Sequence, residues 1–120
     1  MGETLRILLV DDSPYDRGMV RRELKQEFDD VEVLDVTNES EFAASLESPT
    51  FDLVITDFQI RWTDGLKVFR AVKDRLPDCP VLMFTATGSE EIAVEAMKNG
   101  LDDYIIKNVQ HMVRLRGAAR

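Results

Sequence analysis

Short apolar runs alternate with helix-like segments along the whole chain, and this alternation limits the fold more than any other feature. Apolar runs predict five strands, at residues 6–10, 31–36, 51–57, 79–86 and 103–107. Segments with helical spacing of their apolar residues follow at 14–28, 39–48, 65–76, 89–100 and 109–120. Unbroken apolar runs are typical of strands buried on both faces, and crossovers of this length join parallel strands. The sequence therefore predicts a single α/β domain, a doubly wound (βα)5 fold with a five-stranded parallel sheet.

Capping residues support the predicted helix boundaries. Pro14 suits the first turn of a helix, with Ser13 or Asp12 as its cap. Asn38 followed three residues later by Glu41 resembles a capping box. The alternating pattern of 31–36 is the one expected of an edge strand.

Charge and cysteine content narrow the class of protein. Among 120 residues, 15 are basic and 23 acidic, giving a net charge of −8 that argues against a nucleic-acid surface. No apolar run approaches the ~20 residues of a membrane span, and the N-terminus lacks the features of a signal peptide. The single cysteine, Cys79, cannot form an internal disulfide and suits a reducing compartment. We expect a cytoplasmic domain that binds neither nucleic acid nor membrane.

Polar residues stand where the predicted strands end. The first strand ends in Asp11 and Asp12, the third in Asp57, the fourth in Thr85 and the fifth in Lys107. The carboxyl ends of parallel strands meet at one edge of a sheet, where open α/β sheets bind ligands. We therefore expect three carboxylates, a hydroxyl and an ammonium to converge there.

Three neighbouring carboxylates repel one another unless a cation lies between them. Mg²⁺ (or Mn²⁺) prefers oxygen ligands and usually keeps water and phosphate in its remaining positions. Lys107 and Thr85 would bind the oxygens of a phosphoryl group, and a carboxylate beside the metal can accept that group. In the alternative interpretation, the acids only cap strand ends and Lys107 is a structural ion-pair partner. This would be the better explanation for any one of these residues, but five of them at strand ends favour a functional site.

Four motifs carry a family resemblance. The segments "LLVDDS", "DLVITD", "MFTATG" and "DYIIK", with "TDG" at 63–65, resemble the receiver domain of two-component response regulators, similar to chemotaxis regulators. The resemblance covers about residues 5–118. It implies a flavodoxin-like sheet with strand order 2-1-3-4-5.

The resemblance also implies roles for the acidic residues. Asp57 corresponds to the phosphoacceptor, while Asp12 and Asp57 correspond to direct Mg²⁺ ligands, with the backbone carbonyl of Gln59 as a third. Asp11 would hold a metal-bound water or share in the coordination. Gln59 and Thr87 correspond to positions that tune the lifetime of the aspartyl phosphate.

The implied activity is phosphorelay signalling. A histidine kinase or phosphotransfer protein would donate a phosphoryl group from a phosphohistidine to Asp57, and hydrolysis would reset the switch. Thr85 and Lys107 would contact the phosphoryl group, and Tyr104 falls at the family's aromatic switch position. The fourth helix, fifth strand and last helix would form the responding surface and a possible homodimer face. The domain would catalyse only its own phosphorylation and dephosphorylation, so we do not expect an enzyme. For Tyr104, the alternative to a switch residue is an aromatic side chain that is half-buried in its strand.

Two positions depart from the family pattern. Ile60 and Arg61 replace a common Met-Pro pair, so Arg61 adds a positive charge that would modulate the site. Trp62 comes next in the sequence. Its position favours an aromatic side chain that packs within the loop, and a contact with a partner protein is the alternative. Asn108 stands where proline commonly follows Lys107. The resemblance implies a cis 107–108 bond, which without proline costs about 2.5–4 kcal/mol, or else a rebuilt loop.

Other classes of protein fit less well. A haloacid-dehalogenase-type phosphatase needs a second acid where this chain has Gln59, and a flavodoxin-like nucleotide or flavin binder needs a glycine-rich loop in place of "DDSPYD". The lone His111 lacks the acidic neighbour of a phosphohistidine site. A receiver-like docking module that works without phosphorylation stays open because of Arg61 and Asn108.

The final residues, "VRLRGAAR", read as an unfinished helix. We expect residues 1–120 to be the N-terminal part of a longer multidomain signalling protein, whose output or sensor domain would be a partner. A free-standing regulator is the alternative.

Overall fold

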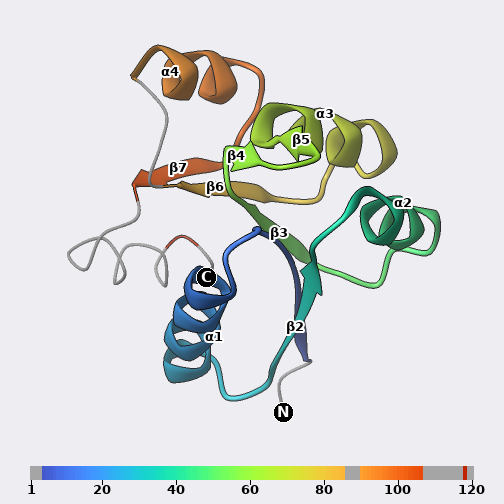
Figure 1. Ribbon diagram of the computed structural model, residues 1–120, viewed down its shortest axis with the longest axis vertical. Coiled ribbons are helices and arrows are strands. Elements are labelled where there is room, and N and C mark those ends of the chain that lie inside the picture. Colours follow the sequence, from blue (N-terminus) through green and yellow to red (C-terminus); the bar gives the residue numbers. More distant parts are fainter. Residues whose placement is uncertain (1–3, 86–89, 107–117, 119–120) are drawn as a thin grey trace.

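A central sheet of five parallel strands forms the middle layer of the molecule (Figure 1). The computed structural model describes residues 4–85, 90–106 and 118. The strands are β1 (Leu5–Val10), β2 (Val31–Val36), β3 (Leu53–Thr56), β6 (Val81–Thr85) and β7 (Asp103–Ile106). Their order is β2-β1-β3-β6-β7, with every neighbouring pair parallel. The predicted fold class and strand order are confirmed, with β2 at an edge.

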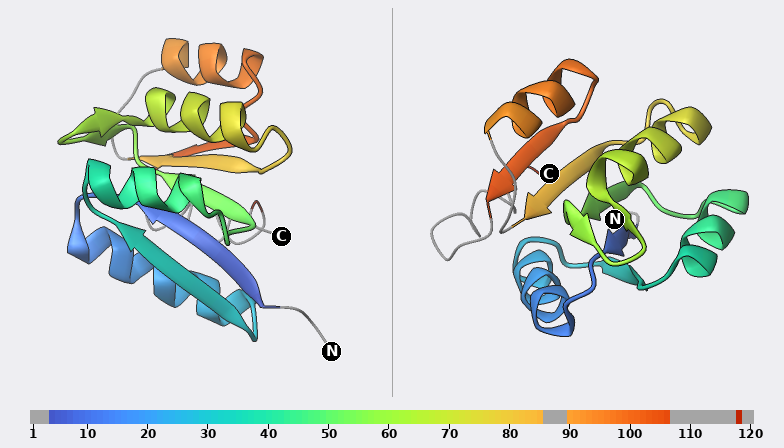
Figure 2. Two further views of the ribbon diagram at one scale, coloured as in Figure 1. Left: turned by 90° about the vertical axis from the view of Figure 1, so that its right-hand side faces the viewer. Right: turned by 45° about the horizontal axis from the view of Figure 1, so that its top comes forward.

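Helices cover both faces of this sheet (Figure 2). They are α1 (Pro14–Glu27), α2 (Glu39–Glu47), α3 (Gly65–Arg75) and α4 (Glu90–Lys98). Observed and predicted boundaries differ by no more than two residues for these four helices and for the five strands of the central sheet. The predicted helical segment 109–120 lies outside the described residues except for Ala118, which is helical. None of the described helices is both long and apolar enough to span a membrane.

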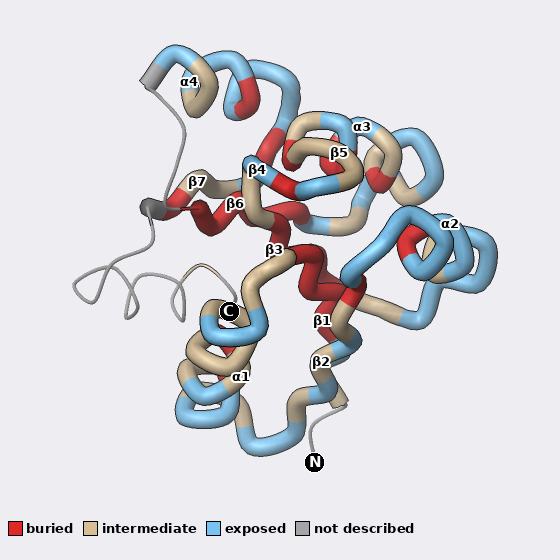
Figure 3. Tube along the Cα trace, in the orientation of Figure 1, coloured by how far each residue is buried: buried red, intermediate tan, exposed pale blue. Residues whose placement is uncertain are grey.

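The central strands β1, β3 and β6 are buried over most of their length (Figure 3). On β1, Ile7 and Leu9 join the core cluster beneath α1, which also contains Leu24. Their neighbours Leu8 and Val10 join the opposite cluster, which contains residues of α2, α3 and α4. Alternate side chains of a strand point to opposite faces, so a strand between two helical layers must be apolar throughout.

Side-chain caps begin three of the described helices, at Ser13, Asn38 and Asp64. Oγ of Ser13 accepts a hydrogen bond from the N–H of Asp16 at 3.2 Å, so Ser13 is the cap of α1. At α2, Oδ1 of Asn38 accepts from the N–H of Glu41 at 2.9 Å. The Glu41 carboxylate reaches one residue beyond the cap and accepts from the N–H of Thr37 at 2.9 Å. This bond lowers the pKa of Glu41. The capping box is thus present in a version lengthened by one residue.

A small hairpin between β3 and α3 was not predicted. Strand β4 (Gln59–Ile60) pairs antiparallel with β5 (Thr63–Asp64). Ile60 is buried, whereas Gln59 and Arg61 are exposed. Strands of two residues are too short to show a period, so this element was missed. It lies at the carboxyl end of β3, where the candidate site residues gather.

Candidate functional site

Register alone brings the acidic residues of β1 and β3 to one edge of the sheet. Val10 pairs with Thr56, the last residue of β3, and the N–H of Asp57 donates to the carbonyl of Val10 at 2.9 Å. Asp11 and Asp57 therefore leave adjacent strands at the same level. The ends of β1 and β3 thus converge as expected, and the pairing of their backbones is the reason.

Asp11 is buried, with only 2% of its surface exposed. Its Oδ1 accepts a hydrogen bond from the N–H of Ser13 at 2.9 Å. Its main-chain carbonyl accepts from Nη1 of Arg17 at 2.7 Å. Side chain and main chain of Asp11 are thus both held by the start of α1.

Asp12 is half-buried and faces the hairpin. Its Oδ2 accepts a hydrogen bond from the main-chain N–H of Arg61 at 2.6 Å. Arg61 itself is exposed, and the contact shown here between Arg61 and Asp12 is made by the Arg61 backbone. A charged acceptor makes such a bond stronger than one between neutral groups.

Asp57 is half-buried, and its Oδ1 accepts from the N–H of the next residue, Phe58, at 2.6 Å. The start of α3 lies close behind it: the N–H of Gly65 donates to the carbonyl of Phe58 at 2.7 Å. A Cβ at Gly65 would stand 2.6 Å from the Asp57 carbonyl oxygen and 2.9 Å from Cε of Met83. Only glycine permits this approach of α3 to the acidic segment.

Thr85 is fully buried at the carboxyl end of β6 and pairs with Ile106, the last residue of β7. Lys107, which follows Ile106 in the sequence, lies outside the described residues, as do Thr87, Asn108, His111 and the 107–108 bond. Their predicted roles and the cis geometry therefore stay predictions.

Tyr104 lies on β7, paired with Met83 of β6. Its ring is half-buried and packs against the core cluster on the α2–α4 side of the sheet. Burial raises the pKa of its hydroxyl, and the Asp57 carboxylate adds to this in the same direction. The negative charge of Asp57 therefore disfavours the phenolate form of Tyr104.

The oxygen donors at this edge are of the kind that a hard divalent cation prefers. Among the residues that the structure describes, no three His, Cys, Asp or Glu side chains are grouped closely enough to form a metal site by themselves. Mg²⁺ usually takes one or two carboxylates and completes its shell with water and phosphate. The residues Asp12 and Asp57, with Gln59 beside them in β4, fit an ion of this type by the chemistry of their oxygens.

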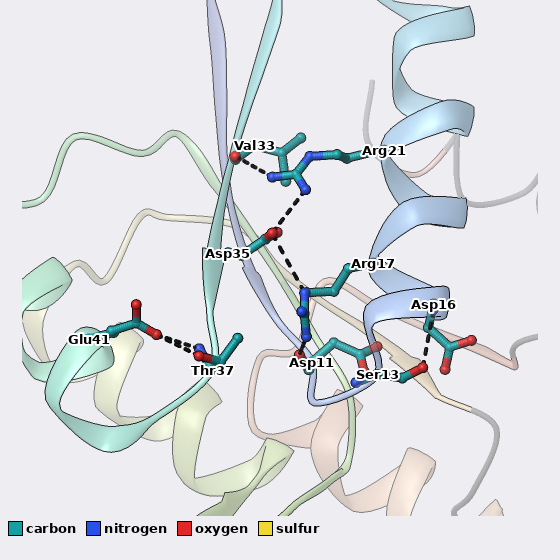
Figure 4. A network of polar contacts seen from close by, with 9 residues as sticks. All are labelled: Asp11, Ser13, Asp16, Arg17, Arg21, Val33, Asp35, Thr37 and Glu41. Carbon is teal, nitrogen blue, oxygen red and sulfur yellow. Dashed lines mark hydrogen bonds and ion pairs between the residues drawn. The ribbon is translucent and has the colours of Figure 1, made fainter.

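An ion-pair network near the site was not predicted. Asp35, on β2, lies 2.9 Å from Nη1 of Arg21 and 3.6 Å from Nε of Arg17 (Figure 4). No role was predicted for the end of that strand, because an acid on an edge strand usually faces solvent. The spacing of Arg17 and Arg21, one helical turn apart, was the available signal.

Trp62 proves to be a packing residue. Its ring lies 5.7 Å from that of Phe42, centroid to centroid, at an interplanar angle of 44°. Phe42 belongs to α2, so this contact fastens the hairpin to a neighbouring helix. The interpretation of Trp62 as a loop-packing aromatic is confirmed.

Comparisons with known proteins agree with this geometry. The transcriptional regulatory protein TrcR of Mycobacterium tuberculosis is 34% identical over 122 residues, which cover 99% of this chain and 47% of TrcR. A receiver domain protein from Clostridium thermocellum has a similar structure, with a TM-score of 0.83 and 26% identity over 96% of this chain and 90% of that one. The Mn²⁺-bound form of response regulator Rcp1 shares the fold, with a TM-score of 0.76 and 22% identity over 93% and 88% of the two chains.

The chain thus spans about half the length of TrcR. The model of the response regulator receiver domain family matches residues 7–119, which include every acidic residue of the site. This chain belongs to the response regulator receiver domain family.

Proposed function

We propose that this domain accepts a phosphoryl group on Asp57 from the phosphohistidine of a histidine kinase or phosphotransfer protein, in a reaction that requires Mg²⁺ or Mn²⁺. The observation that supports this most is the placement of Asp11 and Asp57 at one level of adjacent strands, in a receiver domain. Transfer leaves the histidine nitrogen neutral and forms a mixed anhydride with the Asp57 carboxylate.

The metal would be held by Asp12, Asp57 and the carbonyl of Gln59, with Asp11 taking part directly or through water. Bound there, it would offset the negative charge that develops on the phosphoryl oxygens. The Mn²⁺-bound form of Rcp1 supports a divalent cation in this fold. The Ser13 and Arg61 amides would hold the Asp11 and Asp12 carboxylates while the ion enters.

The readout would pass from Asp57 to the α4–β7 side of the molecule. Thr85 ends β6 beside β7, and the Asp57 carboxylate adds to burial in raising the pKa of Tyr104. Val94 and Met97 of α4 are exposed, and with Tyr104 they line a hollow between α4 and β7. A change at Tyr104 would alter this hollow, where an output domain, a target or a second copy would bind.

The domain would act as a switch in the cytoplasm and turn over no substrate other than its own phosphoryl group. Because it spans about half of TrcR, an output domain in the same longer protein is part of the proposal.

Intact mass spectrometry after incubation with acetyl phosphate and Mg²⁺ tests this function. Wild type should gain one phosphoryl group, Asp57→Asn none, and wild type with EDTA none. Asp64→Asn is the matched control, because Asp64 lies in the same loop but caps α3 through the Lys67 N–H at 2.9 Å, a bond that asparagine retains. Absence of labelling in wild type, beside a control receiver that is labelled, would overturn the proposal and favour the phosphorylation-independent docking module.

A further inference from the structure

A chain of polar contacts runs from the edge strand to the acidic site (Figure 4). Nη2 of Arg21 donates to the carbonyl of Val33 at 3.0 Å, and Nη1 of Arg21 donates to Oδ2 of Asp35 at 2.9 Å. The same oxygen lies 3.6 Å from Nε of Arg17, whose Nη1 donates to the carbonyl of Asp11 at 2.7 Å. One guanidinium thus connects β2 with the peptide unit that follows Asp11.

This peptide unit is the one that joins Asp11 to Asp12. A peptide group is planar, so fixing its carbonyl also fixes its N–H and the directions of the Cα atoms on either side. Both Cα atoms here carry a carboxylate of the site. Arg17 therefore sets the relative placement of the two acids through their shared backbone, whereas Ser13 holds only the side chain of Asp11.

The burial of Arg17 indicates that its position is well defined. Its side chain is 15% exposed and that of Asp35 is 28% exposed, compared with 52% and 66% for the Arg6–Glu32 pair between β1 and β2. Ion pairs between exposed side chains contribute little, because both partners are hydrated and mobile. Within the described part of the chain, Oδ1 of Asp35 is buried without a hydrogen-bond partner, and both arginines contact the other oxygen, Oδ2.

Asp35 has a second effect on the site. Its carboxylate draws the Arg17 guanidinium toward β2, while Arg17 contacts the site through a carbonyl oxygen rather than a carboxylate. The positive charge is thereby partly neutralised by Asp35, and the site acids keep their attraction for an incoming cation.

We propose that Arg17, oriented by Asp35, is a positioning residue for the divalent-cation site. The inference rests on the proposed function, because it assumes that Asp11 and Asp12 serve that cation. Groups that orient metal ligands from outside the coordination shell typically change metal affinity or activity by 10–100-fold when they are mutated. Loss of the Arg17–Asp35 pair should raise the Mg²⁺ dissociation constant about tenfold.

The test uses Arg17→Gln and the nearly isosteric Asp35→Asn. The matched controls are Arg6→Gln and Glu32→Gln, which remove the same charges from an exposed ion pair between β1 and β2. Charge alone gives opposite signs for the two test variants: removing the Arg17 cation should tighten Mg²⁺ binding, whereas removing the Asp35 anion should weaken it. Positioning predicts weaker binding in both, so Arg17→Gln separates the two explanations.

Three readouts are compared, beginning with amide spectra of the metal-free protein. The Asp12 and Ser13 N–H resonances should shift in both test variants and stay in place in both controls. Mg²⁺ titration should then give midpoints about tenfold higher in the test variants. The acetyl phosphate labelling rate at saturating Mg²⁺ should return to within about twofold of wild type, since only cation binding is impaired.

Two results would overturn the inference. One is a lower thermal midpoint of unfolding in the test variants with an unchanged Mg²⁺ midpoint, which marks a purely structural pair. The other is tighter Mg²⁺ binding in Arg17→Gln, which marks a charge effect alone. If either result is found while wild type is still labelled on Asp57, the proposed function is unaffected and only the role of Arg17 is refuted. A wild type that neither binds Mg²⁺ nor is labelled would overturn both.

Discussion

The main-chain N–H of Arg61 and the carboxylate of Asp12 lie 2.6 Å apart, although 49 residues separate them in the sequence. This bond ties the β4–β5 hairpin to the loop after β1. Hydrogen bonds to charged groups contribute about 1.5–3 kcal/mol. Asp12→Ala should therefore speed hydrogen exchange of the Arg61 amide by at least about tenfold, measured by NMR. The Lys67 amide, bound to Asp64, is the control and should exchange as before. Equal protection of the Arg61 amide in the variant and wild type would contradict the bond.

Two glycines should respond in opposite directions to substitution by alanine. At Gly65 the new Cβ meets backbone at 2.6 Å, so the start of α3 and the Asp57 segment must separate. We expect Gly65→Ala to lower the free energy of unfolding by about 1–3 kcal/mol. At Gly18, inside α1, nothing lies within 4 Å of the added Cβ. Gly18→Ala should raise the free energy of unfolding by about 0.5–1 kcal/mol.

Urea denaturation of the two glycine variants beside wild type gives both values. A Gly65→Ala protein as stable as wild type would show that α3 does not press on the Asp57 segment.

Tyr104 should titrate above the ordinary tyrosine value of 10.0, because burial and the Asp57 carboxylate both disfavour the phenolate. Tyr15 is the other tyrosine, so absorbance titration in a Tyr15→Phe background reports on Tyr104. Adding Asp57→Asn should lower the pKa of Tyr104 while leaving it above 10.0, because burial is the larger cause. A pKa unmoved by Asp57→Asn would show that the two groups do not interact.

The same shift makes stability depend on pH in a defined direction. A phenol whose pKa is raised on folding stabilises the protein fully below its unfolded pKa, and this contribution is lost as pH rises through the folded value. The alkaline loss of stability should therefore be smaller in Tyr104→Phe than in wild type.

The sheet could be predicted because burial on both faces leaves an unmistakable signal. "ILLV" (7–10) and "VLMF" (81–84) have no polar position, and each lies in a central strand with both faces covered. Since parallel strands align their carboxyl ends, Asp11 and Asp57 could be placed together from their positions after such runs. The burial pattern that predicts the strands therefore also predicts where their terminal acidic residues meet.

Contacts that depend on tertiary geometry were beyond sequence reasoning. Asp35 follows an alternating edge pattern and reads as a solvent-facing acid, yet α1 places two arginines against it. The Arg61–Asp12 bond uses a backbone N–H, which every residue but proline has, so the identity of residue 61 gives no sign of it. The hairpin that positions this amide is too short to leave a pattern.

The Arg21 side chain also affects how one molecule meets another. Strand β2 lies at the border of the sheet, and such borders expose backbone groups on which a strand from a second chain can assemble. The guanidinium of Arg21, on α1, donates a hydrogen bond to the carbonyl of Val33 at 3.0 Å. An incoming strand would have to displace a charged side chain to reach that acceptor. The residue that pairs with Asp35 thereby also occupies one hydrogen-bond acceptor of the edge strand.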